Sequence, residues 1–112
     1  MAHNFKNLLI WQKGMDICAE IDEIFSKFPK HELYKLSSQM NGASVSIPSN
    51  IAEVSNRGNK HFILFLNNSL GSSYELQTQL LIALRRKYVC NKVEENLIEF
   101  QKMTIGFINK LT

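Results

Sequence analysis

Apolar residues recur every three or four positions along most of the chain, and this spacing is typical of amphipathic α-helices. Short breaks divide the pattern into four segments, at about residues 8–27, 32–56, 60–88 and 93–111. No stretch alternates apolar and polar residues over the length of a half-buried strand. The sequence therefore predicts one all-α domain, residues 1–112, folded as an up-down-up-down four-helix bundle.

Pro48 lies inside the apolar row of the second segment, which consists of Leu36, Met40, Ala43, Ile47, Ile51 and Val54. A proline within a helix removes a backbone donor and crowds the carbonyl four residues earlier, here that of Ser44, at a cost of about 3 kcal/mol. Ser44, Ser46, Ser49 and Asn50 are candidates to hydrogen-bond the backbone groups that the proline frees. The second helix is therefore predicted to continue through Pro48 with a kink.

Prolines and glycines mark the predicted breaks. Pro29 disfavours helical geometry at the residue before it and so ends the first helix. Gly58 suits a left-handed helix end, Asn59 suits an N-cap, and Gly71 would allow another backbone to approach the third helix. In the first segment the apolar sector covers about half of the circumference, more than one core contact needs. This width indicates burial on a second side, by a neighbouring subunit or by an enveloping bundle.

Composition agrees with a globular protein, since 45% of the residues are hydrophobic and 21% are charged. No apolar run has the 18 or so residues that a membrane span requires, and the N-terminal run 8–11 is too short for a signal-peptide core. We therefore expect a cytoplasmic protein without membrane association. Cys18 and Cys90 are too few and too far apart for a disulfide framework or a metal site, and we interpret them as small buried apolar residues.

Positive charge is concentrated in the second half of the chain. Residues 1–59 contain six bases and six acids, so the net charge of +3 arises in residues 60–112. The bases that cluster, or lie where acids are absent, are Arg85, Arg86, Lys87 and Lys92, with Arg57 and Lys60 as weaker candidates. Cations at the end of a helix also complement its dipole, which is the structural interpretation of the cluster. The functional interpretation is contact with an RNA or DNA backbone, with Tyr88 able to stack on an exposed base.

Candidate catalytic groups are sparse. His3, His31 and His61 have no partner histidine at helical spacing, so a metal site or general base is not expected at any of them. Glu53 and Glu75 lie on mainly apolar helices, where buried hydrogen bonds or a subunit contact are favoured over an acid/base pair. The sequence therefore predicts no enzyme, no cofactor and no bound metal.

Several segments together resemble one protein family over nearly the whole chain. They are residues 9–13, Phe28-Pro29, 32–34, 38–40, 43–53, Arg57-Gly58, 65–66, 70–72 and 75–80. The chain resembles the four-helix bundle proteins encoded by 23S rRNA intervening sequences (S23-type), whose relatives include accessory proteins of diversity-generating retroelements. The resemblance implies a homopentamer of up-down bundles. Family members usually carry a basic pair after the position of Gln39, where this chain has Met40 and Asn41, and a glycine after the position of Glu53, where it has Val54.

Charge and resemblance together favour a non-enzymatic oligomeric accessory protein. In this hypothesis the basic residues, repeated around a ring of subunits, contact the backbone of RNA or DNA. The alternative is a scaffold that docks a protein partner, such as a reverse transcriptase, without binding nucleic acid directly.

Overall fold

The computed structural model describes residues 4–32, 35–54, 57–88 and 93–112 and contains four α-helices. These are α1 (Leu9–Phe25), α2 (Leu36–Val54), α3 (Asn59–Arg85) and α4 (Val93–Leu111), with two short 3-10 turns, η1 (Phe5–Asn7) and η2 (Lys30–Glu32). The described residues contain no strand. The all-α four-helix prediction is confirmed.

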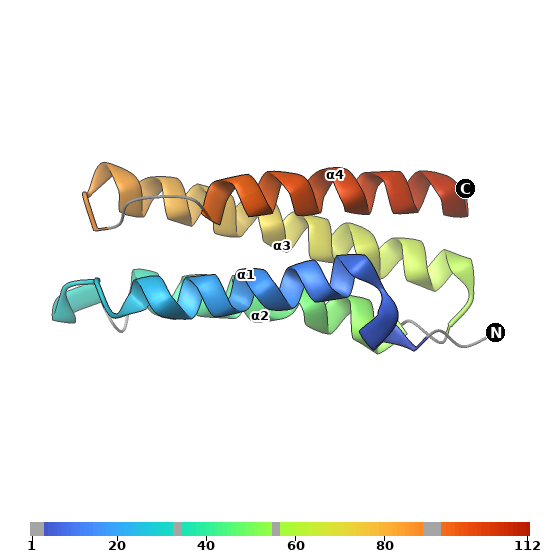
Figure 1. Cartoon of the computed structure of the whole chain (residues 1–112), viewed down its shortest axis with the longest axis horizontal. Helices are drawn as coiled ribbons and strands as arrows, with labels where there is room; N and C mark the ends of the chain where they lie inside the picture. Colours follow the sequence, from blue (N-terminus) through green and yellow to red (C-terminus); the bar gives the residue numbers. More distant parts are fainter. Residues whose placement is uncertain (1–3, 33–34, 55–56, 89–92) are drawn as a thin grey trace.

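Consecutive helices run in opposite directions along a bundle of 46 × 21 × 20 Å (Figure 1). Each helix packs against two neighbours, so that α1 and α3 both contact α2 and α4. The α1–α2 and α3–α4 connections lie at one end, here called the Pro29 end, which includes residues 26–32, 35 and 86–88 (Figure 1). The opposite end, called the Gly58 end, includes η1, residues 57–61 and the last turn of α4 (Figure 1).

The core consists of one buried row from each helix, as the helical periodicity predicts. The fully buried large side chains are Phe62, Phe100, Ile17, Ile21, Met40, Ile47, Ile51, Leu66, Leu76, Leu80, Leu97 and Val54. The second apolar row on α1 is less buried, since Trp11, Cys18 and Phe25 are half-buried and Met15 is 45% exposed. The wide apolar sector of α1 therefore leaves apolar surface uncovered within one chain.

Helix α2 runs through Pro48, and α1 packs closely against it there. A Cβ atom placed on Gly14 would lie 3.1 Å from Ile47 Cγ2 and 3.4 Å from Pro48 Cβ, so only glycine leaves this approach free of crowding. One turn further along α1, the thiol of Cys18 donates a hydrogen bond to the Ser44 carbonyl, with an Sγ–O distance of 3.1 Å. This is the carbonyl that loses its helical donor to Pro48.

The polar residues around Pro48 therefore act differently from the prediction, because a side chain of α1 reaches the freed carbonyl instead. Ser49 Oγ donates to the Val45 carbonyl at 2.7 Å, and Asn50 Nδ2 donates to the Ser46 carbonyl at 2.8 Å. Both reinforce the same turn of α2. The kink itself stays a prediction. Cys18 is half-buried and hydrogen-bonded and is not simply a small apolar residue, while Cys90 lies outside the described residues.

Other local expectations are wrong. Gly58 is not left-handed, because it occupies the N-cap of α3, where an extended backbone is usual. Its φ is −64° and its ψ is 161°, and its carbonyl accepts the first helical bond, from Phe62 N at 3.1 Å. Asn59 is consequently the first helical residue rather than the cap. Gly71 is exposed, and a Cβ placed there would have no neighbour within 4 Å, so no other part of the described chain approaches it.

The start of α2 also differs from the sequence pattern. The helix begins at Leu36 rather than near residue 32, and Lys30–Glu32 form the separate turn η2. Before α1, the turn η1 is capped by Asn4, whose Oδ1 accepts from Lys6 N at 3.2 Å. Such short 3-10 turns are common connectors next to α-helices.

Candidate nucleic-acid interface

The basic cluster at the end of α3 lies on the surface of the bundle. Arg85, Arg86 and Lys87 are all exposed at the Pro29 end of the bundle. The helix closes there with paired backbone bonds, from Lys87 N to the Leu84 carbonyl and from Tyr88 N to the Ala83 carbonyl, both at 3.0 Å. These two bonds form a Schellman motif, which fixes where the basic side chains leave the helix.

Lys87 has a left-handed backbone, with φ of 62°. This position of a Schellman motif is usually glycine, since a residue with a Cβ atom loses about 1–2 kcal/mol in the left-handed region. Among the described residues, Lys87 is the one non-glycine residue with positive φ. The chain thus carries a lysine at a position that the backbone disfavours.

The fold brings three further lysines to the same end. The ring of Phe28, beside the α1–α2 connection, lies 5.3 Å from the ring of Tyr88, beside the α3–α4 connection. Exposed lysines flank Phe28 on both sides, at positions 27, 30 and 35. We call the resulting group the basic end patch; it consists of Lys27, Lys30, Lys35, Arg85, Arg86 and Lys87.

Acidic residues accompany this patch at the start of α4. Glu95 is exposed, and Glu94 Oε2 accepts a hydrogen bond from Gln77 Nε2 at 3.0 Å. Both carboxylates lie in the first turn of α4, where the positive end of the helix dipole stabilises negative charge. They bound the basic end patch on its α4 side.

The weaker candidates for nucleic-acid contact do not lie in the basic end patch. Arg57 and Lys60 are exposed at the Gly58 end, the opposite end of the bundle from Arg85 and Arg86 (Figure 1). A single subunit therefore does not present them on one continuous surface with the cluster on α3. Lys92 lies outside the described residues.

Tyr88 is half-buried and packs against the core. Its ring is tilted by 53° against the ring of Phe28. The contact links the two connections of the Pro29 end, and it leaves less of the ring available for stacking on a base than the sequence predicts.

The arrangement of the two glutamates does not favour catalysis. Glu53 and Glu75 are both exposed rather than joined in buried hydrogen bonds. Ser69 Oγ donates to the Ile47 carbonyl at 2.7 Å, which sets the register of α3 on α2. In this register Glu53 lies level with residue 63 of α3, about 18 Å along the helix from Glu75. The two carboxylates are too far apart to act on one substrate atom.

Two other classes of site are not found in the described part of the chain. No group of three or more His, Cys, Asp or Glu residues there is arranged to hold a metal ion, and His31 and His61 are separately exposed. Within the same residues, no helix combines the length and apolar character needed to cross a membrane.

The model of the 23S rRNA-intervening sequence protein family matches residues 6–109. The chain belongs to this family. A protein with unknown function from the S23 ribosomal protein family of Bacteroides thetaiotaomicron has a similar crystal structure, with a TM-score of 0.80 and 21% sequence identity over 89% of this chain and 98% of that chain. At this level of identity the similarity shows the fold alone. No curated protein matches the chain.

In this 23S rRNA-intervening sequence protein, sequence reasoning located the bases on α3 but missed Lys27, Lys30 and Lys35. Two residues, Phe28-Pro29, separate the first two of these lysines, and four, residues 31–34, separate the last two, so no local charge run marks them. The paired breaks at Pro29 and after Arg85 are the signal that could have joined them, because in an up-down bundle the first and third connections lie at the same end.

Proposed function

We propose that this chain is a non-enzymatic, oligomeric accessory protein that contacts the phosphate backbone of RNA or DNA through the basic end patch. The observation that carries the proposal is the convergence of six exposed bases from two connections at one end of the bundle. Exposed lysines and arginines bind phosphate mainly by neutralising charge and releasing counterions, so sequence-independent binding that weakens steeply with salt is expected.

The left-handed Lys87 supports the same proposal. Backbone strain at a non-glycine residue persists when the surrounding structure imposes it, and such residues cluster at functional positions. Here the Schellman motif holds the Lys87 side chain beyond the last turn of α3, next to Arg86. The description of the family, 23S rRNA-intervening sequence protein, is consistent with an RNA partner.

Fluorescence anisotropy with a structured RNA and with duplex DNA, over a series of salt concentrations, tests the proposal. Each phosphate contact contributes about 0.7–0.9 to the slope of log K against log salt, so R85A/R86A should reduce the magnitude of the slope by roughly 1.4–1.8. The comparison variant R57A/K60A removes two charges at the opposite end and should change the slope less.

Three results would contradict the proposal. They are no binding to either nucleic acid at low salt, binding that R85A/R86A leaves unchanged, and a larger loss with R57A/K60A than with R85A/R86A. The last result would move the interface to the Gly58 end.

A second candidate function is a protein scaffold, and the outer face of α3 favours it. Several large apolar side chains are exposed on this face, including Leu64 at 55%, Tyr74 at 46% and Leu81 at 42%. Gly71 lies among them with open space above it. Contact between copies, in the pentamer that the family resemblance implies, would cover this surface, and so would a protein partner.

Light scattering of the pure protein tests whether the outer face of α3 is covered by contact between copies of the chain or is left for a protein partner. A pentamer that dissociates when Leu64 and Leu81 are replaced by glutamate would assign the face to self-association. A monomeric wild type would contradict the oligomer. Association with a protein partner that survives nuclease treatment, together with an absence of nucleic-acid binding, would favour the scaffold.

A further inference from the structure

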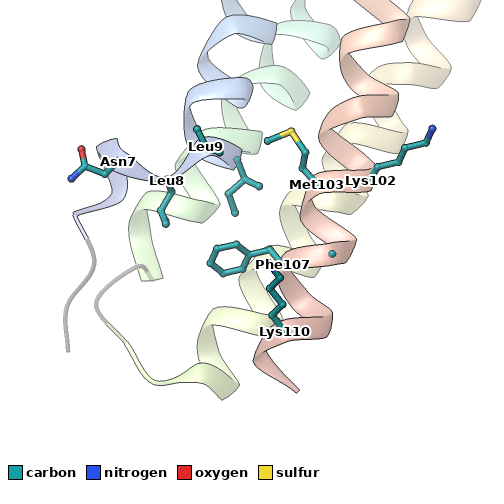
Figure 2. Close-up of a pocket in the computed structure, with 9 residues that line it drawn as sticks. Asn7, Leu8, Leu9, Lys102, Met103, Phe107 and Lys110 are labelled. Atoms are coloured by element: carbon teal, nitrogen blue, oxygen red, sulfur yellow. The ribbon is translucent and has the colours of Figure 1, made fainter.

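A groove of about 460 Å³ lies between the start of α1 and the end of α4 at the Gly58 end (Figure 2). Leu8, Leu9 and Ile10 form one wall, and Met103 and Phe107 extend toward them from α4 (Figure 2). The volume is in the range of small-molecule sites, whose walls are mainly apolar with a few polar groups. Leu9 is 68% exposed, the most exposed of the large apolar side chains among the described residues.

Polar contacts close the groove on one side. Nearer the middle of the bundle, Lys13 Nζ lies 3.1 Å from Glu99 Oε2 and donates to Asn96 Oδ1 at 2.8 Å. These contacts hold α1 against α4. Beyond them the two helices are separated by the groove, so it is open toward the Gly58 end and bounded toward the middle.

The charge of the lining is entirely positive. Lys102 and Lys110 line the groove, and no acidic residue does. Glu99, one turn of α4 earlier, is already paired with Lys13, whereas neither groove lysine forms an ion pair with a described residue. Lys110 lies beside Phe107 at the open end, and Lys102 extends away from Leu8 and Leu9 (Figure 2). The cation placed to meet a ligand in the groove is therefore Lys110.

Gly106 keeps the α4 wall free of side-chain bulk between these lysines. A Cβ placed on it would have no neighbour within 4 Å. The nine residues from Lys102 to Lys110, eight helical steps, span about 12 Å of helix, enough to lie along an alkyl chain of roughly ten carbons. The adaptable side chain of Met103 suits such a flexible chain.

We propose that the α1–α4 groove binds a single-chain amphiphile with a carboxylate head, of the medium-chain fatty acid class. The alkyl chain lies along Gly106 between Leu9 and Met103 and covers Phe107, and the carboxylate is bound by Lys110 at the open end of the groove. This site is independent of the nucleic-acid proposal because it lies at the opposite end of the bundle from the basic end patch (Figure 1).

Titration with dodecanoate below its micelle concentration tests the proposal, followed by calorimetry and by the fluorescence of Trp11, the single tryptophan, directly after the Leu8–Ile10 wall. The expected result is saturable binding of one dodecanoate per chain. Dodecyltrimethylammonium, with the same tail and the opposite charge, should bind about tenfold more weakly, given the modest energy of exposed ion pairs.

Two variants with matched controls locate the site. G106L fills the groove and should abolish binding, while G42L makes the same change at another exposed helical glycine with open space around it and should bind as the wild type does. Both glycines lie inside helices, so leucine should not impair folding. K110E should weaken dodecanoate binding several-fold, whereas K6E, the same charge change outside the groove at the same end, should not.

The proposal is overturned if dodecanoate does not saturate, if G106L binds as well as G42L, or if the cationic amphiphile binds equally well. A change of oligomeric state in G106L, seen by light scattering, would also overturn it, because the groove would then be an interface between copies of the chain. If R85A/R86A loses RNA binding and still binds dodecanoate as the wild type does, the groove and the basic end patch are separate sites.

Discussion

Replacing Gly14 by alanine tests the close approach of α1 to Pro48. Alanine in a helix interior is more favourable than glycine by about 0.8–1.0 kcal/mol, so the substitution would stabilise an unobstructed helix. At Gly14, however, the added Cβ meets Ile47 Cγ2 at 3.1 Å and the Pro48 nitrogen at 3.4 Å. Ile47 is fully buried, and the proline ring is rigid, so neither atom moves easily.

Overpacking of a core of this kind costs about 1–3 kcal/mol. Combined with the gain in helix propensity, Gly14→Ala should destabilise the protein by between about 0 and 2 kcal/mol. Gly42→Ala is the matched control, because Gly42 lies inside α2 with no neighbour within 4 Å of a Cβ. It should stabilise by about 1 kcal/mol, or about 4 °C in Tm.

Urea unfolding followed by circular dichroism measures both variants. Protein concentration must be the same for both, because an oligomer unfolds in a concentration-dependent way. The expected difference between the variants is about 1–3 kcal/mol, with Gly14→Ala the less stable. If Gly14→Ala stabilises the protein as much as Gly42→Ala does, the close approach of α1 to Pro48 is refuted.

Two further predictions concern single polar positions. Cys18→Ala should cost about 1 kcal/mol, because the Ser44 carbonyl loses its thiol donor. Burial raises the pKa of Cys18, so the folded state retains the thiol proton better than the unfolded state. The free energy of unfolding of the wild type should therefore exceed that of Cys18→Ala by its full amount below about pH 8.5, and this difference should shrink as pH rises through the folded-state pKa of Cys18. Urea unfolding at pH 7 and at pH 10 measures the difference, and the same difference at both pH values contradicts the prediction. Lys87→Gly should stabilise by about 1 kcal/mol in thermal unfolding by relieving the left-handed backbone, whereas Lys87→Ala, which loses the same charge and keeps the strain, should not; equal Tm values for the two would refute the strain.

Only half of the basic end patch could be predicted from the sequence. Arg85, Arg86 and Lys87 are adjacent, so their shared position at a helix end follows from local pattern alone. Lys27 and Lys30 belong to a connection more than fifty residues earlier, and they join the patch because Phe28 packs against Tyr88. The exclusion of a glutamate pair likewise required the register of α3 on α2, which no spacing within either helix encodes.

The sequence by itself determined the four helices and their buried rows, because helical periodicity places residues three and four apart on one face whatever the helix packs against. It also placed Pro48 inside α2. Only the tertiary structure decided how that proline is accommodated: Gly14 provides the space and Cys18 the hydrogen bond, both from α1. The periodicity of two helical segments thirty residues apart in the chain does not indicate whether the segments contact each other. Their contact depends on the rotation and translation of one helix against the other, which the packing of the whole core sets.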